Sequence, residues 1–186
     1  MVVVNSDKLK KIIAEVKEES STVTKFSNEL LQEYSADLDG VIHELEIVLD
    51  SIGENSIDEI PDTLIEYYCV KIPALMYRAG VQLEELGMMA DISTAKRRQD
   101  YNDAMLKAQG TVQEKKALVE KEIEDKALVE AIYKRTYSTL RTKLDMAEKM
   151  YSGLKKALSK RISEADLDRF SKDKYVRDSR DREDYE

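Results

Sequence analysis

The chain has 186 residues, of which 37% are charged, and it contains one histidine, one cysteine, no tryptophan and a formal net charge of −8 at pH 7. A single histidine and a single cysteine argue against an intrachain disulfide, a catalytic triad or a histidine-ligated metal site. Only six Gly and two Pro occur, which favours long helices over a sheet. The sequence therefore predicts an all-α protein without enzymatic activity, cofactor or metal.

Charge is distributed unevenly along the chain. Residues 1–95 contain 7 Lys and Arg against 19 Asp and Glu, a net of −12, whereas residues 96–165 contain 17 against 11, a net of +6. Residues 166–186 contain 6 against 8, a net of −2. Phosphate binding needs a local excess of Lys and Arg, so the middle region can bind nucleic acid although the whole chain is acidic. No apolar run suits a signal peptide or a membrane span, so we expect a soluble protein in the cytoplasm.

The first predicted region, residues 1–55, is acidic and helical. The SSTV segment, residues 20–23, is expected to separate a weak first helix from a stronger second one, and Gly53 is expected to end the second. Apolar residues at steps of three or four place one stripe on this helix. The stripe consists of Val23, Phe26, Leu30, Tyr34, Leu38, Val41, Leu45, Val48 and Ile52.

The second predicted region, residues 56–165, is a helical core. Ser56 and Glu59 have the spacing of a capping box, and Pro73 is expected to kink or interrupt the helix that follows. Gly110 is expected to end that helix, and Thr111 with Glu114 is a second capping-box candidate. A hairpin of two elongated helices results. The apolar residues of its first helix include Met76, Ala79, Leu83, Leu86 and Ala90.

The second helix of this hairpin is predicted to run nearly without a break from Val112 to Ile162, because the segment lacks Pro and has a single Gly. Its apolar residues share one face, which we expect to join copies of the chain as in a coiled coil: Leu140, Leu144, Ala147, Tyr151, Leu154, Leu158 and Ile162. The opposite face is cationic and either solvated or bound to nucleic acid: Lys134, Arg135, Arg141, Lys149, Lys156 and Lys160. Residues 166–186 are predicted to form a charged, flexible tail.

The segment STAKRRQDYNDA, residues 93–104, sets three adjacent cations beside an Asp-Tyr pair. On a helix, Tyr101 lies next to Arg97 and Arg98, which precede it by four and three residues. Single-stranded nucleic acid exploits this combination, because cations meet phosphates while an unpaired base stacks on an aromatic ring. The residue types alone leave two interpretations open, a binding site and a solvated helix face.

The spacing Lys96-x-Arg98-x-Asp100-Tyr101 resembles the K-x-R-x-D-Y signature of the UvsY-type recombination mediators of T-even-type phages. An apolar helix with a central Tyr, PALMYRAGVQLEEL, leads into the motif in the same order. The later segment LRTKLDMAEKMYSGLKKALSKRI is similar to the closing helix of that family. The resemblance covers roughly residues 67–162 and leaves out the acidic N-terminal region and the tail.

This resemblance implies a noncatalytic factor that binds single-stranded DNA as a closed oligomeric ring, in the host cell cytoplasm if the gene belongs to a phage. It implies contacts with a RecA-type recombinase and a single-strand-binding protein, and a role in loading the recombinase during phage recombination and repair. By matching position, Lys96 and Arg98 would contact phosphate, with Asp100 and Tyr101 supporting the site. Adjacency and the cationic helix face extend the candidate DNA-binding residues to Lys96, Arg97, Arg98, Asp100, Tyr101, Lys134, Arg135 and Arg141.

Two other functions fit the sequence. A coiled-coil structural or scaffolding protein of a phage particle would oligomerise without binding DNA. An acidic inhibitor that mimics DNA with residues 1–95 would instead capture a basic nuclease. The apolar stripe from Val23 to Ile52 accounts for the acidic region as a packing helix, which makes the inhibitor the weakest of the three hypotheses.

Overall fold

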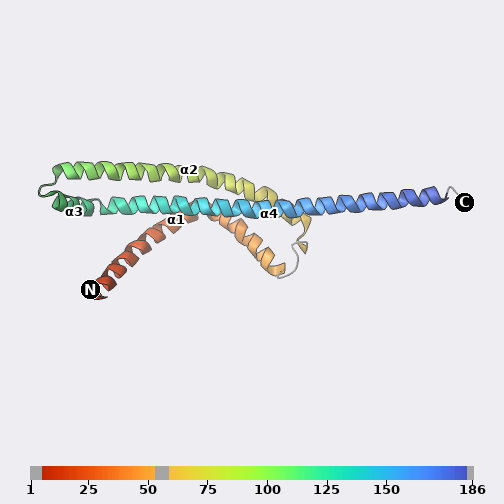
Figure 1. Ribbon diagram of the computed structural model, residues 1–186, viewed down its shortest axis with the longest axis horizontal. Coiled ribbons are helices and arrows are strands. Elements are labelled where there is room, and N and C mark those ends of the chain that lie inside the picture. Colours follow the sequence, from red (N-terminus) through yellow and green to blue (C-terminus); the bar gives the residue numbers. More distant parts are fainter. Residues whose placement is uncertain (1–5, 53–58, 184–186) are drawn as a thin grey trace, which may run out of the picture. The chain divides into compact units, whose positions relative to one another are not determined.

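A computed structural model describes the backbone of residues 6–52 and 59–183, and the side chains of residues 16–51 and 59–171. Four helices make up almost all of this part: α1 (Ser6–Ile52), α2 (Asp62–Lys107), α3 (Val112–Glu122) and α4 (Glu124–Glu183) (Figure 1). The described residues contain no strand, so the predicted all-α fold with elongated helices is confirmed. The capping box expected at Ser56 lies outside the described residues.

Helices α1 and α2 continue through segments that were expected to break them. In α1 the hydroxyl of Thr22 donates to the Glu18 carbonyl at 3.1 Å, so its polar group is satisfied within the helix. Helix α2 includes Pro73, although proline removes one backbone hydrogen bond. Its neighbour Ile72 is fully buried, and this packing holds the helix together across the proline. The predicted break at SSTV and an interruption at Pro73 are both wrong, because α1 and α2 each run through these residues as one helix.

The turn between α2 and α3 has the predicted form. Gly110 adopts a φ of +114°, a conformation that residues with a Cβ avoid. The Thr111 hydroxyl accepts from the Glu114 backbone N–H at 3.4 Å, and the Glu114 carboxylate accepts from the Thr111 backbone N–H at 2.9 Å. The capping box is therefore confirmed. The continuous helix expected after it is interrupted at the buried Ile123, where α3 ends and α4 begins.

Replacing Thr111 by alanine is expected to lower the free energy of unfolding by about 1 kcal/mol, because alanine cannot accept from the Glu114 N–H. Urea denaturation followed by circular dichroism measures the change. Thr111→Ser keeps a hydroxyl at this position and is expected to stay within a few tenths of a kcal/mol of the wild type, since serine caps helices as well as threonine does. Equal stability of the alanine and serine variants would show that the cap does not contribute.

The chain packs into two compact units. The first comprises Met1–Asp37 and Tyr77–Asp145, and the second comprises Leu38–Met76 and Met146–Glu186. Helices α1, α2 and α4 each contribute residues to both units. Each unit is therefore built from two stretches of the chain that are separate in the sequence.

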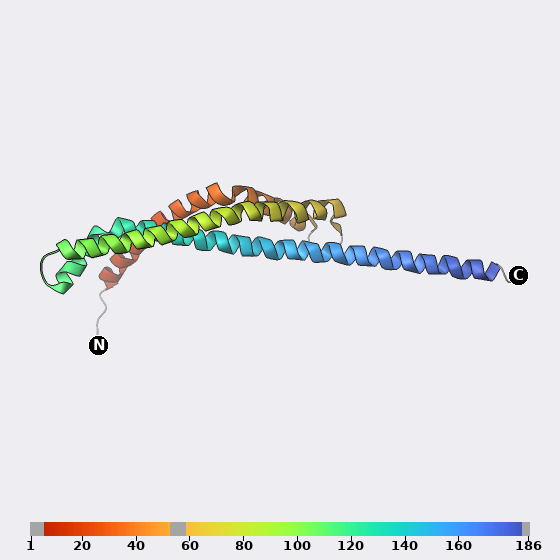
Figure 2. The same ribbon diagram turned by 90° about the horizontal axis from the view of Figure 1, so that it is seen from above.

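In the first unit α2 and α4 lie side by side and antiparallel (Figures 1 and 2). Gly87 of α2 lies against the Tyr137 ring of α4, and a Cβ at this glycine would come within 3.3 Å of the ring. Helix α1 contacts α4 in the same unit, because the Thr136 hydroxyl donates to Ser27 Oγ and the Lys143 ammonium donates to Ser35 Oγ, each at 3.1 Å. Helices α1, α2 and α4 thus pack together in this unit, and α3 adds the fully buried Val119 to its core.

The buried face of α1 in the first unit differs from the predicted stripe. Ser27, Leu31 and Ser35 are buried there, whereas Phe26 is 47% exposed. The buried serines are tolerated because Ser27 accepts from Thr136 and Ser35 donates to the Leu31 carbonyl at 2.8 Å. The predicted stripe is one residue out of register in this part of the helix. A pattern that counts only apolar residues cannot place hydrogen-bonded serines in a core.

The second unit has a more conventional apolar core, in which Leu38, Val41 and Leu45 of the predicted α1 stripe are buried. Val48 is half-buried, and the side chain of Ile52 lies outside the described residues. Arg161 of α4 holds the start of α2, because its guanidinium donates to the Ile60 carbonyl at 2.6 Å and pairs with Asp62. Helix α4 continues to Glu183, so the segment expected to be a flexible tail is helical as far as residue 183. The core residues of this unit include Leu38, Val41, Leu45, Ile65, Tyr68, Ile72, Ala147 and Leu154.

The apolar stripe of α4 packs within the chain. Leu140 is buried in the first unit, and Ala147 and Leu154 are buried in the second. The sequence suggested this stripe as the surface that joins subunits, and that role stays a prediction for the residues that are not buried, such as Ile162, which is 56% exposed.

Candidate nucleic-acid interface

The candidate binding segment, residues 93–104, forms the last part of α2 in the first unit. Ala90, which precedes this segment, and Ala104, its last residue, are both buried, and they identify the packed side of the helix. Arg97 lies on this side with its side chain 40% exposed. Because successive helical residues are rotated by about 100°, Lys96 and Arg98 lie on either side of Arg97, and both are exposed.

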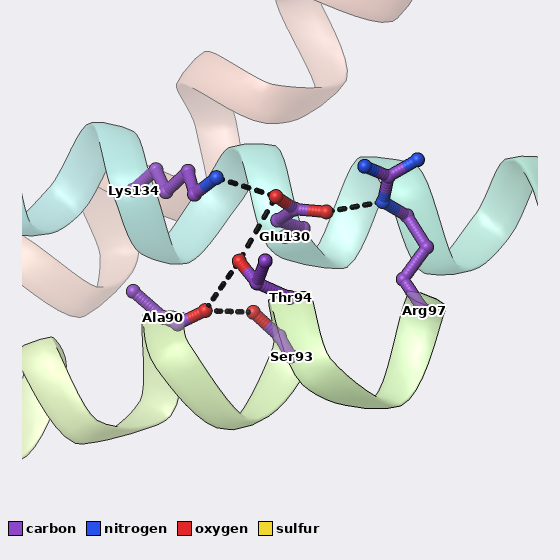
Figure 3. A network of polar contacts seen from close by, with 6 residues as sticks. All are labelled: Ala90, Ser93, Thr94, Arg97, Glu130 and Lys134. Carbon is purple, nitrogen blue, oxygen red and sulfur yellow. Dashed lines mark hydrogen bonds and ion pairs between the residues drawn. The ribbon is translucent and has the colours of Figure 1, made fainter. Parts of the chain in front are cut away.

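Arg97 is bound to a buried carboxylate. Glu130 of α4, whose side chain is 9% exposed, pairs with the Arg97 guanidinium through one carboxylate oxygen. Its other oxygen lies 2.9 Å from the Thr94 hydroxyl and 2.5 Å from the Lys134 ammonium (Figure 3). Both oxygens of Glu130 are therefore occupied, and the cluster of Thr94, Arg97, Glu130 and Lys134 joins α2 to α4.

The cluster lowers the pKa of Glu130 from 4.5 to about 2. The hydrogen bond from Lys134 lowers this pKa most, burial opposes it by raising the pKa, and the hydrogen bonds from Thr94 and Arg97 lower it further. Glu130 is therefore ionised at neutral pH, and its charge is balanced by two cations. A buried carboxylate with this many donors fixes the rotation of each helix at the contact.

Asp100 also forms a contact between α2 and α4. Its carboxylate lies 2.5 Å from the Lys126 ammonium of α4, one turn before Glu130. The following residue, Tyr101, is half-buried. Asp100 thus helps to hold α2 against α4, and the Tyr101 side chain is only partly accessible.

The eight candidate residues do not form one surface. Arg97, Asp100 and Lys134 are in ion pairs, and Tyr101 is half-buried. Arg141 lies on the same side of α4 as Glu130, three turns later, because eleven residues correspond to about three turns. Arg135 lies on the side of α4 that faces α1, where it lines a hollow of about 420 Å³ together with residues such as Val16 and Val23. Among the described residues the exposed candidates that take part in no ion pair are Lys96, Arg98, Arg135 and Arg141.

The sequence did not reveal the residues that organise this site, namely Thr94, Lys126 and Glu130. One signal was present, since Glu130 and Lys134 have the i, i+4 spacing of a helical ion pair. That spacing is common on charged helices and does not indicate burial. The partnership with Arg97, 33 residues away, depends on which turn of α4 lies opposite α2.

Comparisons with protein families, curated proteins and solved structures find no match to this chain. Within residues 6–52 and 59–183, no helix combines the length and apolar character needed to cross a membrane. The same part of the chain contains no cluster of three or more His, Cys, Asp or Glu suited to a metal ion.

Proposed function

We propose that the protein binds single-stranded DNA and acts as a recombination mediator that helps load a RecA-type recombinase during phage recombination and repair. The observation that carries the proposal is the contrast between Arg97, anchored to Glu130, and its neighbours Lys96 and Arg98, which are exposed. The K-x-R spacing of the motif thus corresponds to two cations within reach of a ligand. Exposed cations held on a rigid helix are the element that phosphate recognition requires.

A strand crossing the outer side of α2 would meet Lys96 on one side and Arg98 on the other, because the two residues are separated by about 160° around the helix. The Arg97–Glu130 and Asp100–Lys126 pairs hold the helix in one rotation. Both cations are then presented without further ordering of the backbone on binding. Such preorganisation lowers the entropic cost of binding.

One chain supplies few phosphate contacts at this site, so tight binding requires several chains on one strand. A homo-oligomeric ring, as the family resemblance implies, would provide them. Contacts with the recombinase and the single-strand-binding protein belong to the same proposal, and the acidic first 95 residues offer a surface for a basic partner.

Fluorescence anisotropy with a labelled oligo(dT) tests the proposal. We expect binding whose affinity falls linearly with salt on logarithmic axes, with a slope of about −0.7 for each phosphate neutralised. Measurements between about 0.05 M and about 0.2 M salt define this slope, and a duplex of the same length serves as the comparison. An absence of binding at the lowest salt concentration would contradict the proposed function.

A structural or scaffolding protein of a phage particle is the second candidate. The ion pairs of Arg97 and Asp100 favour it, because they give these residues of the binding segment a role in joining helices without any ligand. This function predicts oligomers without DNA affinity. Size-exclusion chromatography with light scattering, combined with the anisotropy measurement, distinguishes the two candidates.

A further inference from the structure

The side of α2 opposite its packed face carries a row of large apolar side chains. Tyr77 is 79% exposed, Val81 59%, Met88 60% and Ile92 62%, and we call these four residues the outer stripe. Their spacing of four, seven and four residues places them on one face of a helix. The buried residues Ala79, Leu86 and Ala90 lie on the other side. A helix that is apolar on two opposite sides has a second packing surface beyond the one used within the chain.

Charged residues beside the outer stripe form blocks of one sign along the helix, and all of them are exposed: Arg78, then Glu84, Glu85 and Asp91, then Lys96 and Arg98, then Asp103. Glu84 and Glu85 lie between Val81 and Met88, whereas Lys96 and Arg98 lie beyond Ile92, and all four are exposed. At about 100° per residue, Glu84 and Arg98 flank one side of the stripe, and Glu85 and Lys96 flank the other. Between Val81 and Arg98 the face is therefore acidic in its first half and basic in its second half.

When two copies of this face meet in opposite directions, acidic residues of one copy lie opposite basic residues of the other. In an antiparallel pair of α2 helices, corresponding sides of the two stripes meet, and a two-fold axis repeats every contact. With Met88 of one chain packed on Ile92 of the other, Glu84 lies near Arg98 and Glu85 lies near Lys96 of the second copy. The two copies of Asp91 lie beside the two-fold axis and form a like-charge contact, which the four attractive pairs outnumber. A parallel pair in register would set acid against acid and base against base, which is unfavourable.

We propose that the outer stripe is the interface with a second copy of this chain, packed antiparallel through α2. The stripe of α4 is less available for such a contact, because Leu140, Ala147 and Leu154 are buried within the chain. If the proposed DNA binding holds, Lys96 and Arg98 contact both the second copy of the chain and single-stranded DNA. A second copy and a DNA strand then exclude one another on this face.

A charge exchange tests the interface in the absence of nucleic acid. One variant carries Glu84→Lys and Glu85→Lys, and the other carries Lys96→Glu and Arg98→Glu. Size-exclusion chromatography with light scattering should show a dimer or a larger assembly for the wild type. Each variant alone should dissociate with a constant raised at least about tenfold, because attractive pairs become repulsive. An equimolar mixture of the two variants should recover the wild-type mass, since all four pairs are then attractive again.

Glu120→Lys with Glu122→Lys on the exposed side of α3 is the matched control, because it changes the net charge as the first variant does. It should keep the wild-type mass, and circular dichroism should show unchanged helix content in every variant. A wild-type monomer at about 50 µM would overturn the proposal, as would wild-type assembly in both variants or no recovery on mixing. The experiment contains no DNA, so failure of the proposed function leaves its result unaffected.

Discussion

Replacing Glu130 by alanine is expected to lower the free energy of unfolding by about 3 kcal/mol. The side chain of Glu130 is 9% exposed and accepts from Thr94, Arg97 and Lys134. The substitution removes these contacts at once and leaves a gap between α2 and α4. Urea denaturation followed by circular dichroism measures the loss. Glu120→Ala, at an exposed position of α3, is the control and should change stability by no more than about 0.5 kcal/mol.

Acid should remove the same stabilisation in the wild type. The pKa of Glu130 is lowered in the folded protein from 4.5 to about 2, and a lowered carboxylate pKa contributes stability that is present above the unfolded value. A pKa shift of this size contributes about 3 kcal/mol to the free energy of unfolding. This contribution is lost as the pH falls from about 4.5 towards 2. The difference in the free energy of unfolding between the wild type and Glu130→Gln should therefore become smaller as the pH falls through this interval. Equal stability of the two proteins at pH 7 would refute the role assigned to the carboxylate.

The Lys96→Ala/Arg98→Ala variant is expected to bind single-stranded DNA roughly 25-fold more weakly than the wild type at about 0.1 M salt. The estimate assigns one phosphate to each cation, and the salt slope should become shallower by about 1.4. Both side chains are exposed and in no ion pair among the described residues, so the free energy of unfolding should change by less than about 0.5 kcal/mol. Anisotropy titrations at several salt concentrations measure affinity and slope together.

Lys116→Ala/Lys121→Ala removes the same charge from exposed positions on α3 and should leave DNA affinity nearly unchanged. Arg97→Ala is a second comparison, because its expected effect is lower stability through Glu130 with a smaller loss of affinity. Wild-type affinity in the Lys96→Ala/Arg98→Ala variant would exclude this part of α2 from the DNA site. The exposed cations Arg135 and Arg141 would then be the next to test.

Features that depend on neighbouring residues were predicted well. Helix α2 ends at Lys107, Gly110 lies in the turn that follows, and Thr111 with Glu114 starts α3, because each signal acts within a few residues. Pro73 and the SSTV segment do not interrupt their helices, so these local signals alone did not decide where the helices end. The burial of Ala79, Leu86 and Ala90 also followed from helical spacing.

By itself, the sequence determined that the chain forms long helices, where the central turn lies, and which segment concentrates the cations. Only the tertiary structure decided that Arg97 and Asp100 are held by Glu130 and Lys126 while Lys96 and Arg98 are exposed. It also decided which of two apolar faces of α2 is packed and which remains exposed as the outer stripe. Helix formation is encoded by local periodicity, whereas the partner of each side chain depends on the register of helices that are distant in sequence.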